Sequence, residues 1–159
     1  MNDMAQRIRP AAIVKTIEVK TTPERAFDVF ASRMGAWWHK EHSIASGTTQ
    51  KDVVVEPRPG GRWYELGMDG SEHQWGHVID YDPPRRLLLA WQLDRNFDFD
   101  PELVTEVEVL FEPSGDGTSV RFEHRNLERL GEGAAAEMEA MDGGWGMLLG
   151  LFEAKANVA

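Results

Sequence analysis

Three ionisable side chains fall within alternating apolar segments: Glu65, His77 and His124. A two-residue period places each of them on the same face as bulky apolar neighbours, which predicts that it points into the fold. A buried polar group without a partner costs roughly 1–3 kcal/mol, so each must be paired or must serve a ligand. Because histidine also exchanges protons near neutral pH, the three groups could orient or protonate a bound aromatic or acyl compound. Alternatively, they pair with one another, or a one-residue register shift turns them toward solvent.

The other motifs that could carry chemistry do not form a recognisable catalytic site. His39 and His42 flank Glu41 at a spacing that superficially resembles a helical metal-ligand pair, but there is no His-Glu-x-x-His motif. The pair Gly60-Gly61 lacks the Gly-Lys-Ser/Thr of a phosphate-binding loop, and no serine lies in a Gly-x-Ser-x-Gly context. We therefore predict no catalytic residue, no cofactor and no metal ion.

Composition excludes several further classes. The chain has 159 residues, no cysteine and a formal net charge of −10. The absence of cysteine removes disulfides and thiolate-based metal sites, and the negative charge argues against a nucleic-acid partner. No apolar run approaches the ~18–20 residues of a membrane span, and residues 1–10 contain no apolar signal-peptide core. We expect no membrane span and a cytoplasmic location.

The elements that must position these residues begin with a strand over residues 13–20, in which Ile13, Ile17 and Val19 share one face. Thr22 and Pro23 then predict a helix start, with threonine as N-cap and proline in the first turn. A second short helical turn is expected over residues 34–39.

An antiparallel sheet is expected next. Segments of alternating or continuous apolar character, separated by turn residues, predict strands over residues 53–56, 62–66, 72–81, 87–93, 103–112 and 118–127. The Pro-Ser-Gly-Asp-Gly segment at 113–117 predicts a hairpin between the last two. Such a series of strands indicates one curved antiparallel sheet.

The last segment changes to a helical period. Apolar residues recur every three or four positions from Ala134 to Phe152, which predicts a long amphipathic helix. A sheet with one wet face must cover its other face, and only this helix is long enough to do so. We expect an α+β fold: six or seven antiparallel strands wrapped round the C-terminal helix, with two short helices after the first strand.

Large apolar side chains then define the walls of a cavity between sheet and helix. The six tryptophans supply broad apolar surfaces that suit either a core or a pocket. Of the adjacent pair Trp37 and Trp38, one is expected in the core and the other near the cavity mouth. The predicted ligand-binding residues are Trp38, Trp63, Glu65, Trp75, His77, Trp91, Val107, His124, Trp145 and Leu149.

Motifs spread over nearly the whole chain carry a resemblance to a known superfamily. They are the helix start at 22–27, the Trp37-Trp38 pair, the turn at 59–63, the segments 76–78 and 82–87, Gly117-Thr118, and 144–149 in the last helix. With this order and spacing the chain resembles the START/Bet v 1-like (SRPBCC) superfamily. Within it, the chain is similar to the Aha-type domain, the homologue of the activator of the ninety-kDa heat-shock protein ATPase. The resemblance implies a helix-grip fold with a hydrophobic cavity, formed by one domain over residues 13–157 after a flexible segment at 1–12.

The resemblance leaves the function open, because one fold serves many activities. We expect binding of a small hydrophobic ligand, lipid-like or aromatic. The alternatives are a cyclase- or hydrolase-type enzyme that uses the cavity histidines, and a stand-alone regulator of a chaperone ATPase with a role in the stress response. The sequence itself offers no support for a chaperone partner. Open sheet edges make a homodimer a further expectation.

Overall fold

The first strand and the helices after it follow the sequence pattern. The computed structural model describes residues 11–131 and 133–158. Strand β1 (Ile13–Val19) buries Ile13 and Val19, and helix α2 (Pro23–Phe27) begins where its cap predicts, because Thr22 Oγ1 accepts a hydrogen bond from the Arg25 amide at 3.2 Å. A π-helical turn, η1 (Asp28–Ser32), and the short helix α3 (Met34–Trp37) complete this segment.

The remaining strands form one antiparallel sheet. They are β2 (Gln50–Val55), β3 (Arg62–Gly67), β4 (Glu72–Asp82), β5 (Arg86–Trp91), β6 (Thr105–Ser114) and β7 (Gly117–Arg125). Their spatial order is β1-β7-β6-β5-β4-β3-β2, so β1 and β2 are the two edges. All strands after β1 pair with their sequence neighbours, and β1 joins the sheet beside β7. The predicted curved sheet is confirmed, with seven strands.

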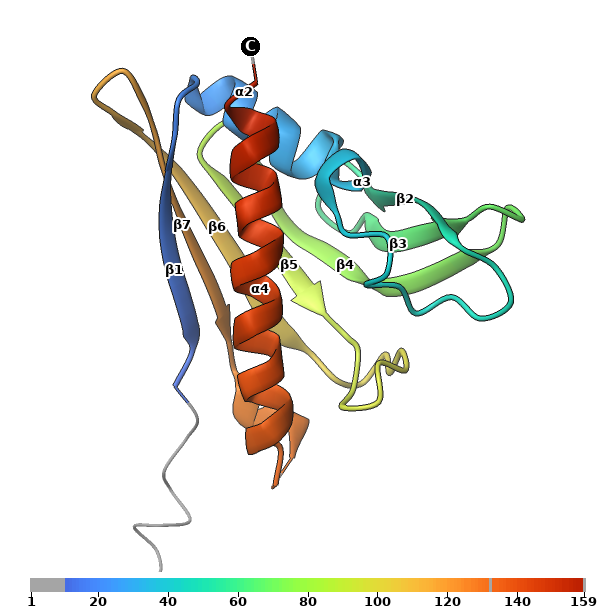
Figure 1. Cartoon of the computed structure of the whole chain (residues 1–159). Coiled ribbons are helices and arrows are strands. Elements are labelled where there is room, and N and C mark those ends of the chain that lie inside the picture. The colour runs from blue at the N-terminus through green and yellow to red at the C-terminus, as the bar shows by residue number, and fades with distance from the viewer. Residues whose placement is uncertain (1–10, 132, 159) are drawn as a thin grey trace, which may run out of the picture.

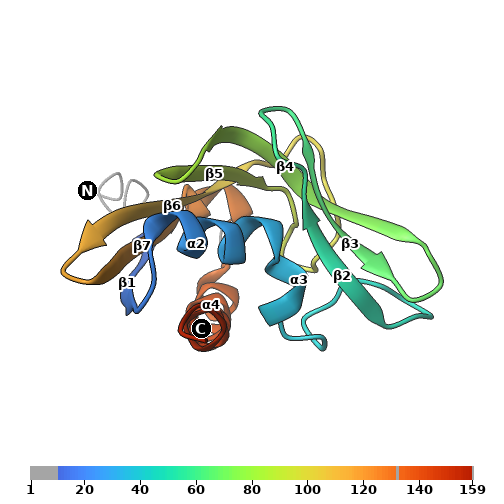
Figure 2. The same ribbon diagram turned by 90° about the horizontal axis from the view of Figure 1, so that it is seen from above.

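The long helix α4 (Ala135–Ala156) lies across the concave face of this sheet (Figure 1). Seen along its axis, the sheet curves over α4, and α2 and α3 close one end of the layer between them (Figure 2). The helix buries Trp145, Leu148, Leu149 and Phe152, as its period predicts. A short 3-10 turn, η2 (Leu127–Leu130), leads from β7 toward it. The helix-grip expectation is therefore confirmed.

Strand β4 departs from simple alternation. Trp63 pairs with Gly76 while Tyr64 pairs with Gln74, so Trp75 is an extra, bulged residue. Cross-strand partners share a face, and Gly76 therefore lies on the concave side with Trp63. A Cβ on Gly76 would sit 1.7 Å from the Ala90 carbonyl oxygen, so only glycine fits here without moving the strand.

The bulge overturns one sequence prediction. His77 follows Gly76 and pairs with Arg62 and Ala90, which turns its side chain to the outer face of the sheet. There its Nδ1 lies 2.8 Å from the amide oxygen of Gln92. The prediction that His77 points into the cavity is wrong, because the extra residue at Trp75 shifts the alternation by one.

Ion pairs cover much of the outer face of β4 to β7. Arg86 contacts Asp80 at 2.8 Å and Glu108 at 2.7 Å, while Arg125 contacts Glu106 and Glu108, both at 2.9 Å. This polar outer face and the apolar concave face are the two sides expected of an antiparallel sheet with one wet surface.

Two further expectations concern the chain as a whole. Among the helices in the part of the chain that the structure describes, none combines the length and apolar character needed to cross a membrane. The segment predicted to be flexible, residues 1–12, lies outside the described residues except for Ala11 and Ala12.

Candidate functional site

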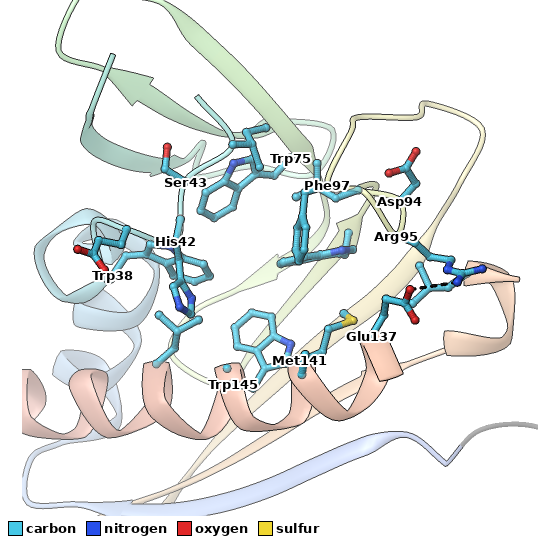
Figure 3. Close-up of a pocket in the computed structure, with 18 residues that line it drawn as sticks. Trp38, His42, Ser43, Trp75, Asp94, Arg95, Phe97, Glu137, Met141 and Trp145 are labelled. Atoms are coloured by element: carbon cyan, nitrogen blue, oxygen red, sulfur yellow. Dashed lines mark hydrogen bonds and ion pairs between the residues drawn. The ribbon is translucent and has the colours of Figure 1, made fainter. Parts of the chain in front are cut away.

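A cavity of about 420 Å³ opens between the concave face, α4 and two loops. Ligand pockets in proteins typically measure about 300–1,000 Å³, so a small molecule fits. Figure 3 shows side chains from the sheet, α4 and both loops converging on this space. Its wall is mainly apolar, and its apolar side chains include Trp38, Ile44, Trp75, Trp91, Leu93, Phe97, Met141, Trp145 and Leu148.

Four tryptophans from separate elements form the core of the wall. Trp38 follows α3, Trp75 lies on β4, Trp91 ends β5 and Trp145 lies on α4. Their rings contact one another, with centroid distances of 4.8 Å for Trp38–Trp75, 5.7 Å for Trp38–Trp145 and 5.6 Å for Trp91–Trp145. These four members of the predicted ligand-binding set therefore line the cavity.

The indole N–H groups of three of these residues are already bonded to the protein. Trp38 Nε1 donates to the His42 carbonyl at 2.9 Å, and Trp75 Nε1 donates to Glu65 Oε1 at 3.1 Å. Trp145 Nε1 donates to His124 Nδ1, also at 3.1 Å. These bonds fix the orientation of the rings, so that carbon surfaces rather than N–H groups remain for a ligand.

Glu65 is fully buried behind this wall rather than at the cavity surface. Its carboxylate accepts hydrogen bonds from the Trp75 indole, from the Ile44 amide at 2.8 Å and from the hydroxyl of Ser43. All three partners are donors, which suits an ionised carboxylate. Glu65 therefore anchors both a wall residue and the loop after α3, and is placed to position the site rather than to contact a ligand.

His124 is also fully buried, and both of its ring nitrogens are bonded. Nδ1 accepts from Trp145, so Nε2 carries the proton and donates to Thr105 Oγ1 at 2.8 Å, while the threonine hydroxyl donates to the Trp91 carbonyl at 3.2 Å. Burial lowers the pKa of His124 to about 3, and the ring is neutral near pH 7. It orders two tryptophans and is not placed for proton transfer to a ligand.

The other predicted site residues lie behind the cavity surface. Trp63 is buried against Trp75 and Trp91, with centroid distances of 5.4 and 5.6 Å. Val107 and Leu149 are buried in the core between sheet and helix. Trp63, Val107 and Leu149 thus pack behind the residues that line the cavity, whereas His77 lies on the outer face of the sheet.

The loop between β5 and β6 closes one end of the cavity, which sequence patterns did not indicate. The Asp94 carboxylate accepts from the amides of Asn96 and Asp98, and this turn holds Phe97 at the cavity with a φ of 62°. An ion pair between Arg95 and Glu137, at 3.0 Å, connects this loop to α4. The hydrogen bond from Arg95 is the main reason why the pKa of Glu137 is lowered.

His42 lines the opposite end, and its side chain remains exposed there. Its backbone carbonyl is held by Trp38 Nε1 and by Gln50 Nε2, the latter at 3.2 Å. Figure 3 shows the His42 ring beside Trp38, over α4. Partial burial and the neighbouring His39 lower the pKa of His42, and Glu41 offsets this only in part. The imidazole is therefore mainly neutral near pH 7.

A metal site finds no support in the geometry. Within residues 11–131 and 133–158, no three His, Cys, Asp or Glu side chains are grouped so that they could hold a metal ion. The His39 and His42 rings are tilted by 48° at a centroid distance of 5.3 Å, and no third ligand among the described residues is grouped with them.

The curved sheet, the long helix across it and the cavity between them define a helix-grip protein. The chain belongs to the family described as Activator of Hsp90 ATPase homolog 1-like protein, whose model matches residues 20–156. No curated protein matches the chain.

Solved structures extend this result. An anthrahydroquino-gamma-pyrone synthase, solved in a complex, is 35% identical, covers 91% of this chain and 96% of its own, and superposes with a TM-score of 0.64. An Aha1 dimer from Colwellia psychrerythraea is 16% identical over 94% of this chain and 98% of its own, with a TM-score of 0.66. A protein from Nitrosomonas europaea is 17% identical over 89% and 91%, with a TM-score of 0.65. The last two show the shared fold alone.

Proposed function

We propose that this protein binds a small, planar aromatic compound in the tryptophan-lined cavity. The observation that carries the proposal is the arrangement of Trp38, Trp75, Trp91 and Trp145 around one space of about 420 Å³. Indole faces form favourable stacked and edge-to-face contacts with other aromatic rings. A flexible lipid chain would make less use of the ring faces.

Preorganisation supports the same conclusion. Glu65 and His124 bond the indoles of Trp75 and Trp145 from behind, so these two rings are already oriented before a ligand enters. A rigid site loses less side-chain entropy on binding, and this raises affinity for a ligand whose shape matches. A flat, rigid compound is the class of ligand whose binding affinity benefits most from such a preoriented wall.

Tryptophan fluorescence tests the proposal. Phenanthrene is expected to quench the emission saturably at micromolar concentrations, because it would lie against several indoles at once. Tetradecanoic acid, with the same number of carbons in a flexible chain, is the matched control and is expected to produce a weaker response. A flat titration with phenanthrene and with other tricyclic aromatics would contradict the proposal.

Ring closure on such a compound is the second candidate function. Its support is the 35% identical relative, which is named as an anthrahydroquino-gamma-pyrone synthase. The test is incubation of the protein with an anthrahydroquinone that carries an open side chain, followed by chromatography for a γ-pyrone product. Product formation above the uncatalysed rate would support an enzyme, whereas tight binding without product would support a binding protein. The chaperone alternative finds support only in the description of the family.

A further inference from the structure

His42 is a polar side chain at the cavity whose chemistry the proposed function does not yet use. Two other polar groups of the wall, on Ser43 and Arg95, are engaged by the protein itself, whereas the second carboxylate oxygen of Glu137 has no partner among the described residues. The Ser43 hydroxyl donates to Glu65, and the Arg95 guanidinium bonds the carboxylate of Glu137. By contrast, no hydrogen bond within the described residues involves either ring nitrogen of His42.

The position of this ring is set by its backbone. Because Trp38 and Gln50 hold the His42 carbonyl, the residue stays at the end of the cavity whatever its side chain does. On α4, a Cβ at Gly144 would lie 3.8 Å from His42 Cε1. His42 and Gly144 both line the cavity, and glycine places no side chain between the imidazole and this part of the helix.

The charge state of the ring suits an acceptor. A neutral imidazole carries one N–H donor and one unprotonated nitrogen that accepts a hydrogen bond. The charged or titratable groups that act on His42 are His39 and Glu41, both on the same loop, and α4 presents the uncharged Gly144. Because the pKa of His42 is lowered, the ring keeps its acceptor at neutral pH.

We propose that His42 accepts a hydrogen bond from a hydroxyl group of the aromatic ligand, so that the cavity selects phenols. This inference rests on the proposed function and narrows its ligand class to hydroxylated aromatic compounds. The indole faces along the walls do not distinguish the two ends of a flat ligand. A hydrogen bond between its hydroxyl and His42 would therefore determine the orientation in which the ligand binds. A phenol donates such a bond, whereas its methyl ether does not.

Three tricyclic probes test the inference: 9-phenanthrol, 9-methoxyphenanthrene and phenanthrene. For the unmodified protein at pH 7.5, we expect 9-phenanthrol to bind about five- to tenfold more tightly than 9-methoxyphenanthrene, the difference that one net hydrogen bond supplies. In His42→Ala this ratio is expected to fall to about one, with the affinity for phenanthrene unchanged. His42→Gln, which retains an acceptor oxygen, should recover part of the preference.

Two matched variants separate His42 from its neighbours. Glu41→Gln and His39→Ala alter the charges beside the ring and are expected to retain the preference for the phenol. The inference is overturned if His42→Ala keeps the preference, or if the preference is lost in Glu41→Gln instead. Binding of phenanthrene and of both substituted probes with equal affinity would also overturn it while leaving the proposed function intact. Failure of all three probes to bind would overturn both.

Discussion

The indole N–H of Trp145 on α4 donates a hydrogen bond to Nδ1 of His124 on β7, at 3.1 Å and in the buried interior. The second ring nitrogen of His124, Nε2, donates a hydrogen bond to the Thr105 hydroxyl. This hydroxyl in turn donates to the Trp91 carbonyl. A directed chain of hydrogen bonds therefore joins the helix to three strands and fixes two of the four cavity tryptophans. Its central group is a neutral histidine, and this has consequences for stability and for its dependence on pH.

His124→Ala is expected to destabilise the fold. The substitution leaves a cavity and removes the partner of the buried Trp145 N–H, and together these effects should lower the free energy of unfolding by roughly 3 kcal/mol at pH 7.5. Urea denaturation followed by tryptophan fluorescence measures the change. His39→Ala is the control and should stay within about 0.5 kcal/mol of the unmodified protein, since His39 lies on the surface loop. Equal stability of the two variants would rule out a structural role for the buried chain.

Acid should weaken the same interaction. Burial lowers the pKa of His124 to about 3 in the folded protein, whereas the unfolded chain takes up the proton near 6.5. The contribution to stability is therefore fully present above pH 6.5 and is lost progressively as the pH falls toward 3. At pH 4.5 the loss is about 2–3 kcal/mol, at 1.36 kcal/mol per pH unit.

Comparison with His124→Ala isolates this effect from the titration of carboxylates. The difference in unfolding free energy between the unmodified protein and the variant should shrink between pH 7.5 and pH 4.5, because only the former carries the buried ring. A difference that stays constant across this range would show that His124 is protonated in the folded state at an ordinary pKa.

Glu65→Gln should loosen one wall of the cavity. The amide brings two N–H donors to a place where Ser43, Ile44 and Trp75 already donate, so at least one buried donor loses its acceptor. We expect a loss of roughly 2–3 kcal/mol in stability, faster hydrogen exchange at the Ile44 amide and weaker binding of phenanthrene.

Glu72→Gln is the matched control for this change. Glu72 is exposed and pairs with Arg62 at 2.9 Å on the surface, where an ion pair contributes at most about 1 kcal/mol. If Glu65→Gln and Glu72→Gln have the same exchange rate at Ile44, Glu65 does not anchor the loop.

Gly144→Leu should block the cavity without harming the fold. Gly144 lines the cavity, and a Cβ there meets only His42 Cε1, at 3.8 Å, so a leucine side chain would extend into the empty space. Replacement of a helical glycine also favours the helix by up to about 1 kcal/mol. Phenanthrene affinity is expected to fall at least tenfold while the thermal midpoint stays the same or rises.

Gly143→Leu provides the comparison, because the adjacent glycine is exposed and a Cβ there meets nothing within 4 Å. It should gain the same helical stability and retain full affinity for phenanthrene. Equal loss of binding in both variants, or in neither, would place the ligand outside this cavity.

Much of the fold could be predicted from local patterns. Alternation in β6 placed Val107, Val109 and Phe111 inside, and all three are buried. The Thr22 cap marked the start of α2, and the helical period marked the buried face of α4. Each of these signals depends on residues a few positions apart, which a single sequence displays directly. The inward positions of Glu65 and His124 were predictable for the same reason.

The sequence by itself thus determined the helix-grip architecture, the aromatic character of the interior and the two buried polar groups that support the cavity. The tertiary structure alone decided what faces a ligand. A bulge at Trp75, set by the register between β3 and β4, turned His77 outward. Folding of two loops against α4 brought His42 and Phe97 to the cavity ends. Register and loop packing depend on contacts between segments distant in sequence, and no local period encodes them.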